Sequence, residues 1–141
     1  MKKVLFVCIH NSARSQMAEA FVNEYSDGSL RAESAGLEPG KMNPYVVKVM
    51  KEKEIDISKN SCDSVQDFLK EGREYDYVVT VCDEASAETC PVFPGGGEKE
   101  HWGFKDPSSF GGIEEEKLTF TRNIRDAIEE KVREFLGRVQ A

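Results

Sequence analysis

The residues best suited to chemistry lie near the start of the chain, where Arg14 follows Cys8 with five residues between them. The apolar run that leads into Cys8 is typical of a strand buried on both faces of a parallel sheet. Helical spacing of apolar residues begins at Met17. The thiol is therefore expected where a strand ends, and the guanidinium where a helix starts.

This arrangement predicts an oxyanion site. Backbone N–H groups of the loop can surround a tetrahedral anion, and the start of a helix adds partial positive charge. Arg14 can hold two anion oxygens in a fixed fork, and Ser15 can donate its hydroxyl to the Cys8 thiolate or to the leaving group. A buried structural cysteine that happens to precede a helix is the alternative. The expected oxyanion-binding residues are Ile9, His10, Asn11, Ser12, Ala13 and Arg14.

Length and charge limit the possible functions. The chain has 141 residues, which suits one domain over residues 1–141. Its net charge of −7 argues against nucleic acid or an acidic membrane surface as a partner. No apolar run is long enough to span a membrane, and the one after Lys2-Lys3 is too short for a signal peptide. A cytoplasmic protein is expected, with its four cysteines redox-active or free.

Strand-like and helix-like segments alternate along the chain. Strands are expected at residues 4–9, 30–35, 75–81 and 98–104, and helices from residue 17, from Asn43-Pro44, around residues 65–69 and over the apolar stripe from Phe120 to Leu136. This order predicts an α/β fold, a doubly wound four-stranded parallel sheet flanked by helices. Ligands of such sheets bind beyond the carboxyl ends of the strands, where Cys8, Cys82 and Asp106 are all expected.

The residues alone leave the roles of Cys82, Cys90 and Asp106 open. The two cysteines flank a short acidic segment and can be unrelated free thiols or half of a zinc site, although their spacing is not Cys-x2-Cys and His10 and His101 are far apart in the sequence. Asp106 precedes a proline, so it can be a plain turn residue or an acid that protonates a leaving oxygen.

A family resemblance favours one of these alternatives for each residue. The string Cys-Ile-His-Asn-Ser-Ala-Arg-Ser-Gln-Met-Ala-Glu-Ala at residues 8–20 resembles the anion loop of the thioredoxin-coupled arsenate reductases, which have the low-molecular-weight protein tyrosine phosphatase fold. The likeness continues around Cys82, at Cys90-Pro91 and at residues 99–104. It implies reduction of arsenate to arsenite without a required cofactor. Phosphate and sulfate would compete with arsenate, and thioredoxin or a similar dithiol protein would supply electrons.

The resemblance also implies a role for each site residue. Cys8 attacks arsenate, Arg14 holds it, and Asp106 protonates the departing hydroxide. Cys82 then attacks Cys8, and Cys90 attacks Cys82. Seven residues separate Cys82 from Cys90, one more than is usual in the family.

Some members of the family bind potassium near the anion loop. The matching side chains here all carry oxygen donors, as a hard cation requires, and are Asn11, Glu19, Ser34 and Asp63. Ordinary hydrogen bonding that braces the loop is the alternative.

Two other functions remain open. A low-molecular-weight protein tyrosine phosphatase, or a phosphatase of small phosphoesters, would use Cys8, Arg14 and Asp106 and ignore the other cysteines. The phosphatases usually place tyrosine directly after Asp-Pro, whereas this chain has Ser108, which weakens the aryl-phosphate interpretation. A redox sensor or zinc-binding module would use the cysteines without catalysis.

Overall fold

The structure is a computed structural model that describes residues 2–82, 97–107 and 111–139. Its helices and strands, in chain order, are β1 (Lys2–Cys8), α1 (Arg14–Tyr25), β2 (Leu30–Gly36), α2 (Pro44–Lys51), α3 (Val65–Lys70), β3 (Tyr77–Cys82), β4 (Glu98–Gly103) and α4 (Glu114–Val139).

Strand β1 and helix α1 place the thiol at a strand end and the guanidinium at a helix start, as predicted. Strand β1 ends at Cys8 rather than at Ile9, so the thiol belongs to the last residue of the strand. Helix α1 begins at Arg14, three residues before Met17, because its first turn is buried through polar side chains and gives no apolar period. The arginine is thus the first residue of the helix.

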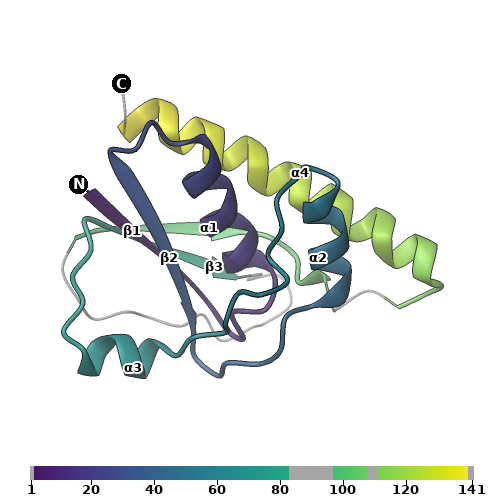
Figure 1. The fold of residues 1–141 in the computed structure, drawn as a ribbon, viewed down its shortest axis with the longest axis horizontal. Coiled ribbons are helices and arrows are strands. Elements are labelled where there is room, and N and C mark those ends of the chain that lie inside the picture. Colours follow the sequence, from purple (N-terminus) through teal and green to yellow (C-terminus); the bar gives the residue numbers. More distant parts are fainter. Residues whose placement is uncertain (1, 83–96, 108–110, 140–141) are drawn as a thin grey trace.

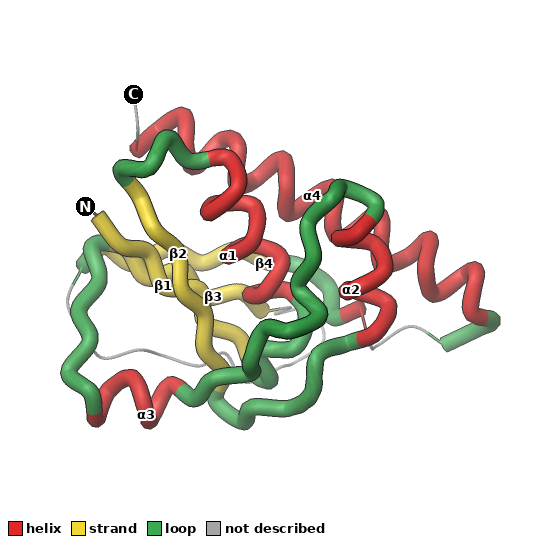
Figure 2. The backbone as a smooth tube through the Cα atoms, in the orientation of Figure 1, coloured by secondary structure: helices red, strands yellow, loops and turns green. Residues whose placement is uncertain are grey.

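The four strands form one parallel sheet in the order β2-β1-β3-β4, which confirms the predicted doubly wound fold. Helices α1, α2 and α4 lie on one side of the strands and α3 lies on the other (Figures 1 and 2). Alternate residues of β1 follow this division. Val4 and Phe6 join the core under α1, α2 and α4, whereas Leu5 and Val7 join the core under α3.

The topology gathers the predicted site at one edge of the sheet. The chain runs from β1 to β2 on one side and then returns to β3 on the other side of β1. Such a reversal leaves a crevice beyond the carboxyl ends of the two central strands. Cys8 ends β1 and Cys82 ends β3.

An aromatic cluster fixes β4 in place. The Trp102 ring lies 5.3 Å from that of Phe6 in β1 and 5.7 Å from that of Phe135 in α4, centroid to centroid. Each such pair adds about 0.5–1.5 kcal/mol beyond the area it buries. This packing holds the segment after β4, which contains Asp106, against the rest of the site. Among the described residues, no helix combines the length and apolarity needed to cross a membrane.

Candidate active site

Two donors converge on the sulfur of Cys8, which is buried at the end of β1. Asn11 N–H donates to Cys8 Sγ at 3.1 Å, and Ser15 Oγ lies 2.8 Å from the same sulfur. Ser15 Oγ already accepts a hydrogen bond from Asn11 Nδ2 at 2.9 Å, which leaves its own O–H to donate to the sulfur. Hydrogen bonds of this kind favour a negatively charged sulfur. The predicted nucleophile therefore has the partners that a thiolate needs.

The loop is braced from within by Asn11, which adopts a left-handed backbone conformation with φ of 54°. Its side-chain Oδ1 accepts from Asp63 N–H at 2.8 Å and from Gln16 Nε2 at 3.2 Å. Gln16 also donates to the Ser61 carbonyl at 2.8 Å, so this one amide ties α1 to the segment before α3. Sequence reasoning missed Gln16, although it stands inside the matched string.

The carbonyl groups of the loop point away from the thiol. Those of Ile9, His10 and Ser12 accept hydrogen bonds from Glu38 (2.7 Å), Gly40 (3.0 Å) and Asn43 (3.0 Å). The His10 ring also turns outward, with Nδ1 2.9 Å from the Glu38 carbonyl. Because the carbonyls face outward, the loop amides are left to face an anion at Cys8.

Helix α1 differs from its neighbours at its N-terminus. Asn43 caps α2 by accepting from Tyr45 N–H, and Ser64 caps α3 by accepting from Gln66 N–H. At the start of α1 stands Ala13, and no side chain within the described ranges caps this helix. The first-turn N–H groups of α1 are therefore suited to an external acceptor such as an oxyanion.

Arg14 and Asp106 meet beside the loop. Arg14 is only 3% exposed, and its Nη1 donates to the Phe104 carbonyl at 3.1 Å. Its Nη2 lies 3.9 Å from Asp106 Oδ2. The structure thus brings the predicted guanidinium and the predicted acid together from opposite ends of the sequence.

The four predicted potassium ligands also lie together. Ser34 Oγ donates to Glu19 Oε1 at 3.0 Å, and Asp63 is close enough to act on Glu19 electrostatically. Burial raises the pKa of Glu19 to about 7, and the charges of Asp63 and Glu33 add to the rise against the opposing hydrogen bond from Ser34. Asn11 suits a cation least, because its amide oxygen already accepts two hydrogen bonds. Among the described residues, no group of three or more His, Cys, Asp or Glu could hold a metal ion.

The other cysteines divide into two kinds. Cys82 is fully buried at the end of β3 and is disulfide-bonded, and its Sγ lies 3.9 Å from His101 Nδ1. Cys8 and Cys62 are free thiols. Cys90, the predicted last member of the relay, lies outside the described residues. Sequence reasoning gave His101 no role at Cys82, since only the pairing of β3 with β4 places it there.

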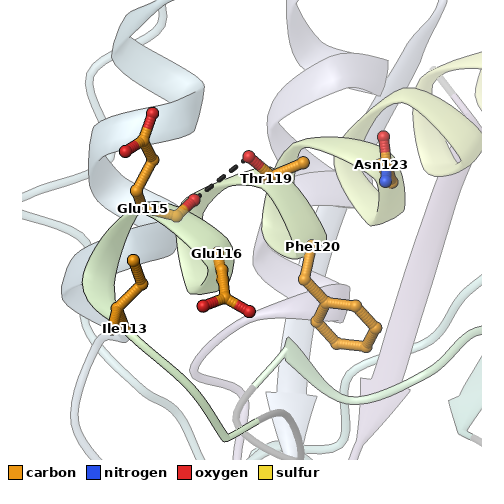
Figure 3. A pocket seen from close by; sticks show the side chains of 6 residues that line it. All are labelled: Ile113, Glu115, Glu116, Thr119, Phe120 and Asn123. Atoms are coloured by element: carbon orange, nitrogen blue, oxygen red, sulfur yellow. Dashed lines mark hydrogen bonds between the residues drawn. The ribbon is translucent and has the colours of Figure 1, made fainter.

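Two cavities differ in their charge and in their distance from the loop. One of about 410 Å³ adjoins the loop and is lined by Ser12, Pro107, Lys41 and Lys117 among others, so an anion entering there meets positive charge. Another, of about 460 Å³, lies on the N-terminal part of α4 beside Glu115 and Glu116 (Figure 3). Its carboxylates would repel an oxyanion, so it is not part of this site.

The site and the fold match a known family. Residues 3–141 match the family described as low molecular weight phosphotyrosine protein phosphatase. The chain belongs to this family. Within the family its relatives include an arsenate reductase from Bacillus subtilis (strain 168), which is 43% identical over 135 residues, 95% of this chain and 94% of that relative.

Solved structures of the family agree. An arsenate reductase in the phosphate binding state has a TM-score of 0.81 and 32% identity, and the match covers 99% of each chain. A thioredoxin-dependent arsenate reductase from Corynebacterium glutamicum has a TM-score of 0.71 and 27% identity, over 99% of this chain and 62% of that one. The predicted family is confirmed.

Proposed function

We propose that this chain reduces arsenate to arsenite by a three-cysteine relay, in the order Cys8, Cys82 and Cys90. The proposal rests on one observation: an oxyanion site and a redox-active cysteine lie at the same edge of the sheet. Cys8 lies in an oxyanion loop with Arg14, and Cys82 ends the neighbouring strand in a disulfide. The arsenate reductases among its relatives support the same substrate.

The first step is nucleophilic attack. The Cys8 thiolate attacks arsenic while the loop amides and the Arg14 fork hold the arsenate oxygens. A sulfur–arsenic bond forms and hydroxide departs, which Asp106 protonates to water. The contact between Arg14 and Asp106 supports these two roles, because both groups reach the same side of the loop.

The second step reduces arsenic. Cys82 attacks the sulfur of Cys8, and the sulfur–arsenic bond breaks with its electron pair remaining on arsenic, which leaves as arsenite. The two sulfurs are thereby oxidised to a disulfide. Cys90 then attacks Cys82 and displaces the Cys8 thiolate, so the disulfide moves to Cys82 and Cys90.

A thioredoxin-type dithiol protein is the proposed reductant. The thioredoxin dependence of the Corynebacterium glutamicum relative supports it. Because Cys8 must return to a thiolate after each cycle, we place the protein in a reducing compartment, the cytoplasm.

We also propose a potassium ion beside Glu19, Ser34 and Asp63, with Asn11 as a weaker ligand. Oxygen donors and two neighbouring carboxylates suit a monovalent hard cation. Potassium chloride should raise the melting temperature more than tetramethylammonium chloride of equal ionic strength, and Glu19→Gln should remove the difference. Equal melting temperatures in the two salts for the wild-type chain would contradict the potassium site.

Hydrolysis of phosphoesters is the second candidate activity, since the matched family is named for it and needs only Cys8, Arg14 and Asp106. The two activities can be separated by mutation. Cys82→Ser should stop arsenate-dependent NADPH oxidation in a coupled thioredoxin and thioredoxin-reductase assay, yet leave hydrolysis of p-nitrophenyl phosphate.

Cys62→Ser is the matched control, because Cys62 is a free thiol outside the relay. It should keep both activities. Full arsenate turnover in Cys82→Ser would refute the relay and favour the phosphatase.

A further inference from the structure

His101 lies beside the sulfur of Cys82 because of the strand register. Thr80 of β3 pairs with His101 of β4, and Cys82 is two residues beyond Thr80. Side chains two apart in a strand share a face, so Cys82 and His101 project from the same face of the sheet. The Nδ1 atom of His101 is 3.9 Å from Cys82 Sγ.

The surroundings leave room for the imidazole at this position. Gly103 pairs with Cys82 across the strands, and a Cβ built on Gly103 would lie 4.0 Å from His101 Nε2. The ring therefore extends over a residue without a side chain, toward the sulfur. Cys82 is fully buried, whereas His101 is exposed and can exchange a proton with water.

We propose that His101 is the base that deprotonates Cys82 when Cys82 attacks Cys8. The proposal rests on the relay proposed above and adds a fourth participant to it. In the structure the contact is made by the sulfur of the disulfide-bonded Cys82. After reduction this sulfur becomes a buried thiol, which cannot pass its proton directly to bulk water, and a neutral imidazole beside it can accept the proton.

The step balances without another reactant. The Cys82 proton moves to the imidazole, and the resulting thiolate donates its electron pair to the Cys8 sulfur. The sulfur–arsenic bond breaks, and its electron pair leaves with arsenic as arsenite. The imidazolium then returns its proton to water through its exposed edge.

Charged groups of β4 and α4 lie near His101. Lys99 lies two residues earlier on the same face of β4. Glu130, Lys131 and Glu134 of α4 line a cavity of about 290 Å³ that also includes His101.

The test isolates the step in a Cys90→Ser background, where the reaction stops at the Cys8–Cys82 disulfide. His101→Gln should slow arsenate-driven formation of that disulfide at neutral pH by at least about tenfold, as expected for loss of a general base. The difference in rate between His101→Gln and the parent should shrink as pH rises above about 8.5, the ordinary pKa of a cysteine, because hydroxide then replaces the base. Added imidazole should partly restore the rate of His101→Ala.

Hydrolysis of p-nitrophenyl phosphate separates chemistry from folding, because it does not use Cys82. His101→Gln should hydrolyse it within twofold of the parent rate, as should Glu98→Gln, an exposed control on the same strand. An equal loss of hydrolysis and disulfide formation would make His101 structural and overturn the proposal.

The relay and the base can fail separately. If Cys82→Ser turns over arsenate fully, the relay itself is wrong. If Cys82→Ser is inactive but His101→Gln forms the disulfide at the parent rate, the relay stands and the role of His101 is wrong.

Discussion

The reactivity of Cys8 depends on a small number of single contacts. Ser15 is fully buried, and its Oγ is held between Asn11 Nδ2 and Cys8 Sγ. Alanine at this position would lose both of these hydrogen bonds. The hydroxyl accepts from Asn11 and can direct its own proton to the sulfur of Cys8.

Ser15→Ala should therefore slow the reaction of Cys8 without unfolding the protein. A hydrogen bond to a charged group contributes about 1.5–3 kcal/mol, which corresponds to at least about tenfold in rate. The measurement is alkylation of Cys8 by iodoacetamide at pH 7, with the modified residue identified by mass spectrometry. Ser58→Ala, at an exposed loop position, is the control. Equal alkylation rates in the two variants would show that Ser15 does not activate the thiol.

At the scale of elements, β2 sets the shape of the loop although it contributes no reacting group. Gly36, its last residue, lies against the loop backbone, and a Cβ there would come within 2.8 Å of Asn11 N and Ile9 O. Asn11 N cannot move without disturbing its hydrogen bond to Cys8 Sγ, and Ile9 O cannot move without disturbing the one that it accepts from Glu38 N–H.

Gly36→Ala should impair anion binding more than it impairs folding. Overpacking of this kind costs about 1–3 kcal/mol, and the strain falls on the loop. Isothermal titration with phosphate should show an affinity at least tenfold lower, with urea unfolding still cooperative. Gly137→Ala in α4 is the control, since its new Cβ meets nothing within 4 Å. Unchanged phosphate affinity in Gly36→Ala would mean that the loop adapts freely.

Glu52, at the end of α2, joins α2 to α4. Its carboxylate accepts hydrogen bonds from Arg122 Nη2 and from Arg125 Nη1, each at 2.8 Å. Hydrogen bonds from Arg122, with those from Arg125, lower the pKa of Glu52 to about 2 from 4.5. A lowered pKa in the folded state stabilises the protein fully above about pH 4.5, and the contribution disappears as pH falls toward about 2.

Glu52→Gln should lower the free energy of unfolding at pH 7 by about 1 kcal/mol or less, because the carboxylate is 40% exposed and screened. Near pH 2 the variant and the parent should be equally stable. Urea unfolding at both pH values measures the difference. Glu114→Gln, which removes the more exposed pair between Lys48 and Glu114, should have almost no effect. A loss for Glu52→Gln that persists at pH 2 would rule out the charge as its cause.

At the scale of the whole molecule, anion binding couples the sheet edge to global stability. The loop draws on β1, α1 and the segments after β2 and β4, so it exists only in the folded chain. A ligand that binds only the folded state stabilises it by about 2.7 kcal/mol at a concentration of 100 times Kd.

Phosphate and sulfate should therefore raise the melting temperature, whereas chloride at equal ionic strength should not. The effect should be much smaller in Arg14→Lys, because lysine keeps the charge but loses the two-pronged fork. Differential scanning fluorimetry over a phosphate series provides the measurement. A wild-type melting temperature that does not change with phosphate concentration would count against a formed oxyanion site.

The sequence by itself determined the sheet and the reacting groups. Buried parallel strands carry continuous apolar runs, and the alternation of such runs with helical periods allows few topologies, so the doubly wound fold could be predicted. Cys8, Arg14 and Ser15 could be placed together because they are close in the chain, and the strand-to-helix switch between them restricts their geometry.

The strand ends predicted that Cys82 and Asp106 lie at the same sheet edge as Cys8, but only the tertiary structure decided which side chains meet there. The proximity of Asp106 to Arg14 and of His101 to Cys82 depends on how β4 pairs with β3, and no local pattern encodes that register. The first turn of α1 has no apolar period, because it is buried through polar contacts of Arg14 and Gln16, and only the structure shows what these side chains contact. Local periodicity reports apolar burial, whereas a polar site is assembled by hydrogen bonds between segments far apart in the chain.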